Sequence, residues 1–439
     1  MSRSRPGEIR AMFPPEPPAA GEPLDSILAD LDRIVLPGVT HWNHPSFFAY
    51  FPSNSSLSSV LADLVSSGLG VQGMSWQTSP AATEIEEVVM DWLRQMLGLP
   101  PDFSGVIQDT ASTATLIAML CARERATGFS QNRGGMAGEA GPVAVYASSQ
   151  AHSSVEKAAL LAGFGKDNIR LIDTDDSHAL RLDRLEEAIE ADRRDGLRAA
   201  AVVATIGTTG TMAVDPLLGI AEIARRHSAW LHVDAAMAGS AMILPECRSH
   251  WNGIERADSL VVNPHKWLAD SFDLTVYYVR EPQHLIRVMS TNPSYLVTAH
   301  DAEVKNFRDW GIALGRRFRA LKLWFLLREQ GVAGLQLRLR RDLENAKWLA
   351  GRVDASPGWE RVAPVAFQTV CVRHRTADNL AIASSVNAGG RAYITPAVLK
   401  GRQMLRLSVG AEATERRHVE ALWEDLQAAA ANLAVPPKE

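Results

Sequence analysis

AAAVVATIG at residues 199–207 is followed by PLLGIAEIARRH at 216–227 and by WLHVDA at 230–235. The first and last runs are short and continuously apolar, whereas the middle run has the apolar spacing of an amphipathic helix. Continuous apolar strands are typical of a sheet that is buried on both faces, and a helix between two strands joins them in parallel. This unit predicts an α/β protein with a largely parallel sheet.

The same alternation continues on both sides of this unit. VAVYA (143–147) precedes the helical pattern SSVEKAALLAGF (153–164), and SLVVN (259–263) follows as another apolar strand. Nearer the N-terminus, SPAATEIEEVVMDWLRQMLGLP (79–100) predicts a helix between Ser79-Pro80 and Gly98. Its expected apolar stripe consists of Ile85, Val88, Val89, Trp92, Leu93, Met96 and Leu97.

The two ends of the chain have different patterns from the middle. Residues 14–23 are rich in proline and predict an extended lead-in, and LDSILADLDRIVLPG (24–38) has helical spacing. Residues 290–309 predict a loop, followed by a helix at 315–331. After about residue 330, the order helix (338–353), strand (365–374), helix (377–390), strand (403–410) and final helix predicts a second, smaller α+β domain.

Composition excludes several classes of protein. The chain has 439 residues, is 46% hydrophobic and carries a formal charge of -5, so it is large enough for a sizeable core. Lys+Arg 45 nearly balance Asp+Glu 50, which argues against a nucleic-acid partner. Cys121, Cys247 and Cys371 are widely separated, which argues against a disulfide framework or a zinc site and favours a cytoplasmic location. We expect no metal, no secretion signal and no membrane anchor.

The stretch GLGVQG (68–73) matches the dinucleotide-binding pattern G-x-G-x-x-G. That motif requires a strand before it and a helix directly after it. Here LADLVSS before the motif has a helical pattern, and MSWQTSP after it does not open a helix at once. The context therefore argues against a dinucleotide site.

Asp234 ends the apolar run WLHV, and Lys266 follows SLVVN within NPHKW. Taken alone, Asp234 is better interpreted as a helix cap, and the ordinary interpretation of Lys266 is a surface lysine. Pro264 and Trp267, however, predict a rigid and partly buried setting for the lysine. Together, a carboxylate and a lysine at two strand ends suit pyridoxal phosphate, whose aldehyde needs an amine and whose ring nitrogen needs an anion. A structural ion-pair network remains the alternative.

Two further positions lie just after predicted strands. His152, in QAHSSVEKA, is either a helix cap or a ring that stacks on a cofactor. Ser112 and Thr113, in DTASTATLIAML, precede a helix whose free N–H groups can receive a phosphate. Ordinary N-capping is the alternative for this pair.

These residues and their surroundings resemble a known family. HVDAAMAGSA, NPHKW, QAHSSVEKA, HPSFFAYFP and SPAATEIEEVVMDWL together resemble the group II pyridoxal-phosphate decarboxylases, in particular the aromatic-L-amino-acid decarboxylases. The resemblance runs from about Leu28 to near the C-terminus. It implies a fold-type I homodimer with active sites at the subunit interface. Its expected parts are a segment wrapping the partner (1–56), a large domain with a mostly parallel seven-stranded sheet (57–328) and a small domain (329–439).

The resemblance also implies a role for individual residues. Lys266 is expected to bind the cofactor aldehyde, Asp234 to pair with the ring nitrogen and His152 to stack on the ring. The remaining cofactor contacts implied by the family are Ala236 on the opposite face, Thr110 and Ala111 at the phosphate, Asn263 and His265 beside the lysine, and Thr209 in TIGTTGT. Here Asp109-Thr110 stands where Gly-Ser is common in the family, which puts the details of phosphate binding in doubt.

The implied reaction is decarboxylation of an aromatic L-amino acid to an arylalkylamine and CO2. Tyr295, in NPSYLVT, matches a loop tyrosine that delivers a proton to Cα from the partner subunit, where aldehyde-forming relatives usually carry Phe. The expected substrate-binding residues are Trp42, Tyr50, Phe51, Pro52, Gln72, Met74 and Gln368. The last three depart from the residues of animal enzymes, and the two glutamines suit a ring hydroxyl or an indole N–H.

Other functions remain open at this point. An aldehyde-forming oxidative deaminase or an aminotransferase would keep the cofactor and change the reaction. A decarboxylase of another amino acid, such as histidine, would keep the reaction and change the substrate. A non-catalytic relative would fold and dimerise but would turn over no substrate.

Overall fold

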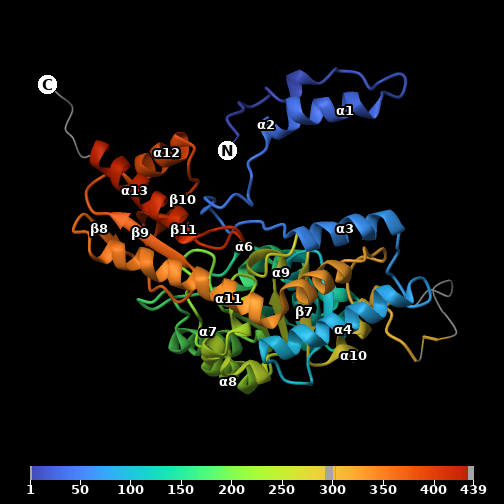
Figure 1. Cartoon of the computed structure of the whole chain (residues 1–439). Coiled ribbons are helices and arrows are strands. Elements are labelled where there is room, and N and C mark those ends of the chain that lie inside the picture. The colour runs from blue at the N-terminus through green and yellow to red at the C-terminus, as the bar shows by residue number, and fades with distance from the viewer. Residues whose placement is uncertain (1, 140, 292–299, 302, 434–439) are drawn as a thin grey trace.

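The computed structural model describes residues 2–139, 141–291, 300–301 and 303–433. Figure 1 shows a large body built on one sheet, a smaller unit beside it, and an N-terminal segment that stands clear of both. The small sheet lies at one end of the long helix α11 (Ala320–Asp354), which links the two units.

The large sheet has seven strands in the order β1-β7-β6-β5-β4-β2-β3. The strands are β1 (Ser104–Gln108), β2 (Val143–Ser148), β3 (Ile169–Ile172), β4 (Arg198–Thr205), β5 (Trp230–Asp234), β6 (Ser259–Val262) and β7 (Thr275–Val279). Strand β7 runs antiparallel to both of its neighbours, and every other pairing is parallel. The predicted α/β class is confirmed, and β1, β3 and β7 add three strands that the apolar runs had not indicated.

Helices cover both faces of this sheet, as the continuous apolar strands require. Along β2, Val143, Val145 and Ala147 pack with helices α5 (Ala111–Thr127), α6 (Ser153–Leu161) and α10 (Pro282–Met289). The alternate residues Ala144 and Tyr146 pack on the other face. That face is covered by α4 (Pro80–Leu97), α7 (Leu182–Arg194), α8 (Leu217–Arg226) and part of α11. The two-residue period of a strand therefore divides the core into two layers.

Helix α4 begins and ends where the sequence predicts, but it buries a different face. Ser79 caps its N-terminus by accepting a hydrogen bond from the Ala82 N–H, and Gly98 ends it in the left-handed region with φ 69°. Val88 and Trp92, predicted to be core residues, are exposed. Residues that include Glu86 and Met90 are buried instead. The Glu86 side chain points inward because it forms a buried ion pair with Arg316. The predicted stripe was therefore wrong at Val88 and Trp92.

The small unit consists of a four-stranded antiparallel sheet and helices on it. Its strands are β8 (Trp359–Arg361), β9 (Thr369–His374), β10 (Thr395–Leu399) and β11 (Arg402–Ser408), in the order β10-β11-β9-β8. Helices α12 (Asn379–Gly389) and α13 (Arg416–Leu433) share its core with the C-terminal part of α11. The two helices predicted at 315–331 and 338–353 are joined in α11, and only Gly331, with φ 59°, interrupts the helical backbone. The domain limit at residue 329 remains a prediction.

The N-terminal segment contains α1 (Leu24–Asp30), a π-helical turn (Leu31–Val35) and α2 (Leu36–Gly38). These elements lie apart from the body in Figure 1, and Ile34 is their one buried residue. The chain then returns to the small unit, where the Phe48 N–H donates to the Tyr393 carbonyl at 2.8 Å. Helix α3 (Leu57–Leu69) follows, includes Gly68 of GLGVQG and ends at the C-cap Gly70, which confirms that no strand leads into that motif.

Candidate active site

Lys266 lies in α9 (Pro264–Trp267), a single helical turn that follows β6. Asn263 caps this turn and Pro264 opens it. Trp267 is fully buried, and its indole N–H donates to Asp342 Oδ2 at 3.0 Å. The rigid and partly buried setting predicted from Pro264 and Trp267 is therefore confirmed. Lys266 was expected at the end of the strand. It lies instead in the helical turn that Pro264 begins.

Burial changes the chemistry of the Lys266 amine. Loss of solvent lowers its pKa to about 8, the nearby Asp234 carboxylate opposes this shift, and the Arg406 guanidinium adds to it. The Nζ atom lies 3.2 Å from Met237 Sδ. An amine with a pKa near neutral has a larger unprotonated fraction than ordinary lysine, and this is the form that attacks an aldehyde.

Asp234 is the last residue of β5, and β5 pairs in parallel with β6. Its carboxylate is 6% exposed, and Oδ1 accepts a hydrogen bond from the Ala236 N–H at 3.1 Å. This contact closes a local turn rather than capping an α-helix, because the next helical residues begin at Gly239 in a 3-10 turn. The two adjacent strands thus bring a carboxylate and an amine to the same edge of the sheet.

His152 is the N-cap of α6, so the capping interpretation holds for its backbone position. Its Nδ1 accepts from the Ser154 N–H at 3.2 Å and lies 2.8 Å from Ser154 Oγ. Loss of solvent lowers the pKa of His152, with the Asp234 carboxylate raising it and the Lys266 ammonium lowering it. The charges of Asp234 and Lys266 therefore both act on the His152 ring. A neutral ring beside them suits stacking on a flat cofactor.

A phosphate can be received at the start of α5. Thr110 is the N-cap of this helix, but its side chain makes no capping hydrogen bond. Instead, Asp109 Oδ1 accepts from the Thr110 N–H at 2.6 Å. The N–H groups of the first turn, from Ala111 onward, are therefore left without a side-chain cap. A helix N-terminus in this state is a site for an anion.

Asn263 and His265 are both buried, and each has an N–H donor that makes no hydrogen bond within the described residues. Asn263 Oδ1 accepts from Thr275 Oγ1 at 2.8 Å, which leaves its amide N–H2 group to donate elsewhere. His265 Nδ1 accepts from the Leu274 N–H at 3.1 Å, and burial lowers the pKa of the ring to about 4. The neutral ring then carries its proton on Nε2. Together with Lys266, Asp234 and His152, these donors fit pyridoxal phosphate.

Thr209 belongs to the loop after β4, and Arg406 of β11 holds this loop. The Arg406 Nε donates to the Thr209 carbonyl at 2.6 Å, and its Nη1 donates to the Tyr50 carbonyl. The guanidinium is 4% exposed, and burial lowers its pKa to about 10. Arg406 thus binds the loop of Thr209 and the segment of Tyr50, and its charge lowers the pKa of Lys266.

The predicted substrate-binding residues fall into three places. Trp42 and Tyr50 stack with ring centroids 5.2 Å apart, and Phe51 and Pro52 are buried beside them. Gln368 is fully buried in the small unit, and neither of its amide atoms has a hydrogen-bond partner.

The third place is the segment between α3 and α4. There, Gln72 Oε1 accepts from the Arg316 N–H at 2.8 Å, and the Met74 carbonyl accepts from the Arg308 N–H at 2.9 Å. Among the described residues, neither of these hydrogen bonds reaches the group around Lys266. Tyr295 lies outside the described residues.

Three positions near the lysine were missed from the sequence. Arg406 had a detectable signal, because it is a single charge within the apolar strand QMLRLSVG. Asn54 donates from Nδ2 to the Lys266 carbonyl at 2.8 Å and to the Gly410 carbonyl at 3.0 Å. Neither Asn54 nor Met237 had a distinguishing pattern, because only the folded chain brings them to Lys266.

A doubly covered sheet with this carboxylate, histidine and lysine at its strand ends defines a pyridoxal-phosphate-dependent enzyme. The model of the pyridoxal-dependent decarboxylase conserved domain matches residues 6–375. The chain therefore belongs to the pyridoxal-dependent decarboxylase family, and it is an amino-acid carboxy-lyase that uses pyridoxal phosphate. The resemblance inferred from the sequence motifs is confirmed.

Named relatives cover almost the whole chain. Tryptophan decarboxylase 2 of Oryza sativa subsp. japonica is 40% identical over 97% of this chain and 89% of its own length. Aromatic-L-amino-acid decarboxylase of Bos taurus is 40% identical over 98% of this chain and 90% of its own. The crystal structure of Oryza sativa TDC with PLP and tryptamine is 40% identical, with a TM-score of 0.95, and the match covers 99% of this chain and 93% of that one.

Proposed function

We propose that this protein decarboxylates an aromatic L-amino acid and releases an arylalkylamine and CO2. The observation that carries the proposal is the grouping of His152, Asp234 and Lys266 beyond neighbouring strand ends, where the Asp234 carboxylate raises the pKa of both His152 and Lys266 against the effect of burial. Relatives named for tryptophan and aromatic-L-amino-acid decarboxylation, at 40% identity, support the aromatic class of substrate.

The residues of the chain divide the work of this reaction. Lys266 holds the cofactor aldehyde, and the Asp234 carboxylate keeps a proton on the ring nitrogen. When bound, pyridoxal phosphate supplies an electron sink for the electron pair left by the departing carboxylate. His152 and Ala236 would contact the cofactor ring from its two sides. The surrounding side chains would orient the substrate so that its carboxylate can depart.

Aromatic side chains favour a flat substrate. Trp42, Tyr50 and Phe51 supply ring surfaces. The Gln368 amide is fully buried and has no partner, so a polar atom on the substrate ring would relieve the cost of its burial. The family resemblance assigns Gln72 and Met74 to the same pocket; within their own chain, Gln72 Oε1 accepts from the Arg316 N–H and the Met74 carbonyl accepts from the Arg308 N–H.

We also propose a homodimer with active sites at the subunit interface. The exposed apolar side chains of the N-terminal segment and α3 support it, because contiguous apolar surface marks interaction sites. They include Leu24, Ile27, Leu28, Leu31, Leu57, Leu61, Leu64 and Leu69. In this assembly the partner's loop brings Tyr295 to the site. The three unpaired cysteines support a cytoplasmic location. In the part of the chain that is described, no helix is long and apolar enough to cross a membrane.

The decisive experiment is a panel of L-amino acids assayed together for CO2, amine, aldehyde and hydrogen peroxide. We expect CO2 and amine in equal amounts from at least one of tryptophan, tyrosine, phenylalanine or their hydroxylated forms. Turnover of histidine alone, or of aliphatic or acidic amino acids alone, would contradict the aromatic class. Holoenzyme with normal cofactor absorbance and no turnover of any substrate would instead indicate a non-catalytic relative.

An aldehyde-forming enzyme is the second candidate. Phenylacetaldehyde synthase of Arabidopsis thaliana is also 40% identical, over 99% of this chain and 91% of its own length. Overall similarity therefore does not separate the two reactions, and Tyr295 favours the decarboxylase. Tyr295→Phe should suppress amine release and expose aldehyde and peroxide, with Tyr277→Phe, in the buried core, as a comparison. An unchanged amine yield in Tyr295→Phe would show that this tyrosine does not deliver the proton.

A further inference from the structure

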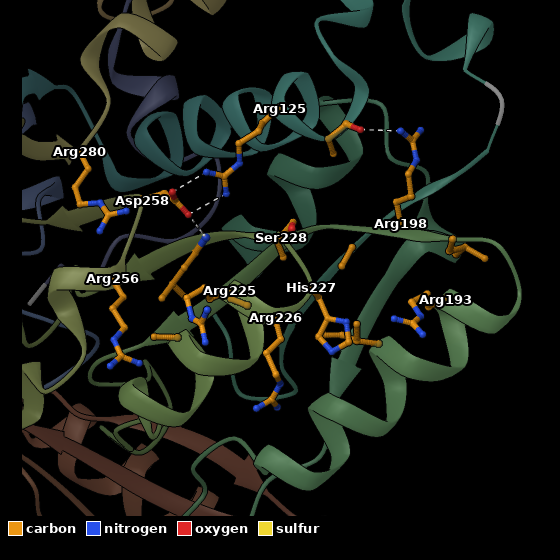
Figure 2. Close-up of a pocket in the computed structure, with 18 residues that line it drawn as sticks. Arg125, Arg193, Arg198, Arg225, Arg226, His227, Ser228, Arg256, Asp258 and Arg280 are labelled. Atoms are coloured by element: carbon orange, nitrogen blue, oxygen red, sulfur yellow. Dashed lines mark hydrogen bonds and ion pairs between the residues drawn. The ribbon is translucent and has the colours of Figure 1, made fainter.

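A cavity lies on the side of the large sheet where the parallel strands begin, away from the strand ends that carry Asp234 and Lys266. It has a volume of about 740 Å³ and opens where β4 and β5 begin, between the C-terminal ends of α7 and α8 (Figure 2). Asp234 lies at the other end of β5. None of the residues that line this cavity takes part in the proposed reaction.

The lining carries a strong positive charge on a chain whose formal charge is -5. Asp258 is its one carboxylate, against His227 and seven arginines, namely Arg125, Arg193, Arg198, Arg225, Arg226, Arg256 and Arg280. Cations at helix C-termini are common because they complement the helix dipole. That effect accounts for the arginines that end α7 and α8, but not for the convergence of further arginines from α5, from the start of β4 and from the loops beside β6 and β7.

Most of these arginines already have partners. Arg125 pairs with Asp258 at 2.7 Å, Arg198 with Glu139 at 3.2 Å, Arg256 with Glu222 at 3.3 Å, Arg226 with Glu186, and Arg280 donates to the Glu255 carbonyl. Within the described ranges, the side chains of Arg193, Arg225 and His227 make no hydrogen bond or ion pair, although their backbones do. Figure 2 shows Arg193 on α7 pointing toward His227 at the end of α8. Two guanidinium groups and an imidazole therefore remain available to an anion.

The floor of the cavity is apolar, unlike its rim. Ile189, Leu197, Ala221, Ala224 and Leu231 form part of the lining, and Ile189, Ala221, Ala224 and Leu231 are buried. A free inorganic ion would leave this surface unused. A ligand with an anionic group at one end and a flat apolar body at the other would use both parts.

We propose that this cavity binds a small organic phosphate. The phosphate contacts Arg193 and His227, Arg225 adds positive charge to the rim, and the body of the ligand covers the apolar floor. A phosphate monoester is a dianion with three acceptor oxygens, and guanidinium groups bind such oxygens through paired, charge-assisted hydrogen bonds. The site is separate from the cofactor phosphate at α5 and does not depend on the proposed reaction.

The test uses the holoenzyme, so that pyridoxal phosphate already fills its own site. Calorimetric titration compares AMP, adenosine and inorganic phosphate as probes. We expect AMP to bind with a dissociation constant on the order of 1 mM or tighter. Adenosine, which lacks the phosphate, and inorganic phosphate, which lacks the body, should bind more weakly than AMP.

Variants then locate the binding. Arg193→Ser with Arg225→Ser should weaken AMP binding by about tenfold or more. The matched control, Arg194→Ser with Arg417→Ser, removes two exposed cations outside the cavity and should leave binding unchanged. Circular dichroism and retained enzyme activity show that both pairs are folded. No AMP binding, equal loss in both pairs, or equal binding of AMP and adenosine would each overturn the proposal. Equal binding of AMP and inorganic phosphate would overturn the role of the apolar floor.

Discussion

Single side chains in this protein serve both the local backbone and the site. Asp234 accepts the Ala236 N–H, and His152 accepts the Ser154 N–H, so each closes the turn that follows its strand. The same contacts fix the direction of the carboxylate and of the ring. His152 caps a helix and Asp234 closes a turn, and neither contact conflicts with the proposed cofactor roles, because a residue at a strand end is both a turn position and part of the sheet's ligand-binding edge.

Asp234→Asn tests the role of the carboxylate. The neutral amide cannot hold a proton on the ring nitrogen, so we expect weaker cofactor binding and a loss of turnover on the order of 100-fold or more. Cofactor titration by absorbance and the rate of amine formation measure the two effects. Asp102→Asn changes an exposed carboxylate and should have neither effect. Near-normal turnover in Asp234→Asn would remove Asp234 from its assigned role.

Asp270, four residues after Lys266, predicts a pH dependence of stability. Its carboxyl group is fully buried, and neither oxygen has a hydrogen-bond partner. Burial raises its pKa from 3.8 to about 7, while Lys322 lowers the pKa and Asp63 raises it. Because the folded state holds the proton more tightly than the unfolded state, stability falls as the pH rises from about 4 to about 7.

Asp270→Asn should remove this dependence. Relative to the unmodified protein, its free energy of unfolding should rise by up to roughly 3 kcal/mol between about pH 5 and pH 8. Chemical denaturation at the two pH values measures the difference. Asp176→Asn, at an exposed carboxylate, should show no such change. If the two proteins keep a constant difference across this range, the carboxylate of Asp270 does not titrate there.

At the scale of elements, a buried ion pair fixes α4 against β1. Glu86 is 3% exposed, and its Oε1 accepts from the Ile107 N–H at 2.8 Å and from Arg316 Nη2 at 2.7 Å. The same guanidinium nitrogen donates to the Ile107 carbonyl at 2.8 Å. This network explains why α4 turns Glu86 inward and leaves Val88 and Trp92 exposed. It also ties the chain before α11 to the sheet.

Glu86→Ala should destabilise the protein strongly. Removing one partner of a buried pair leaves an unpaired charge, at a cost of about 3–5 kcal/mol. We expect a clear fall in the midpoint of thermal or chemical unfolding. The adjacent Glu87, which pairs with Lys305 at 3.2 Å at the surface, provides the control, and Glu87→Ala should change stability little. Similar losses in both variants would contradict the assigned role of the network.

At the scale of the molecule, the N-terminal segment has apolar surface without a cover in its own chain. Met12, Phe13, Leu24 and Ile27 are among its exposed side chains, at 42%, 49%, 67% and 52% of their full surface. A segment of this kind gains stability when a partner buries it. The proposed dimer gives these residues that partner.

Ile27→Asp with Leu31→Asp should therefore weaken the dimer. Two charges placed in an apolar interface cost about 3 kcal/mol or more, so the monomer should become detectable at low protein concentration. Sedimentation velocity measures the change. Val398→Asp, an exposed position on β10, is the control and should leave assembly unchanged. A wild-type chain that sediments as a monomer at all concentrations would overturn the dimer itself.

The sequence alone predicted the α/β class, the largely parallel sheet and the lysine, carboxylate and histidine of the candidate site. Those features are local, because an apolar strand and the residue that follows it can be recognised from consecutive positions in the sequence. The tertiary structure decided the face that α4 buries, the position of β7 between β1 and β6, and the approach of Asn54, Met237 and Arg406 to Lys266. These depend on contacts between residues far apart in the chain, and a linear pattern does not encode which distant side chain fills a given space.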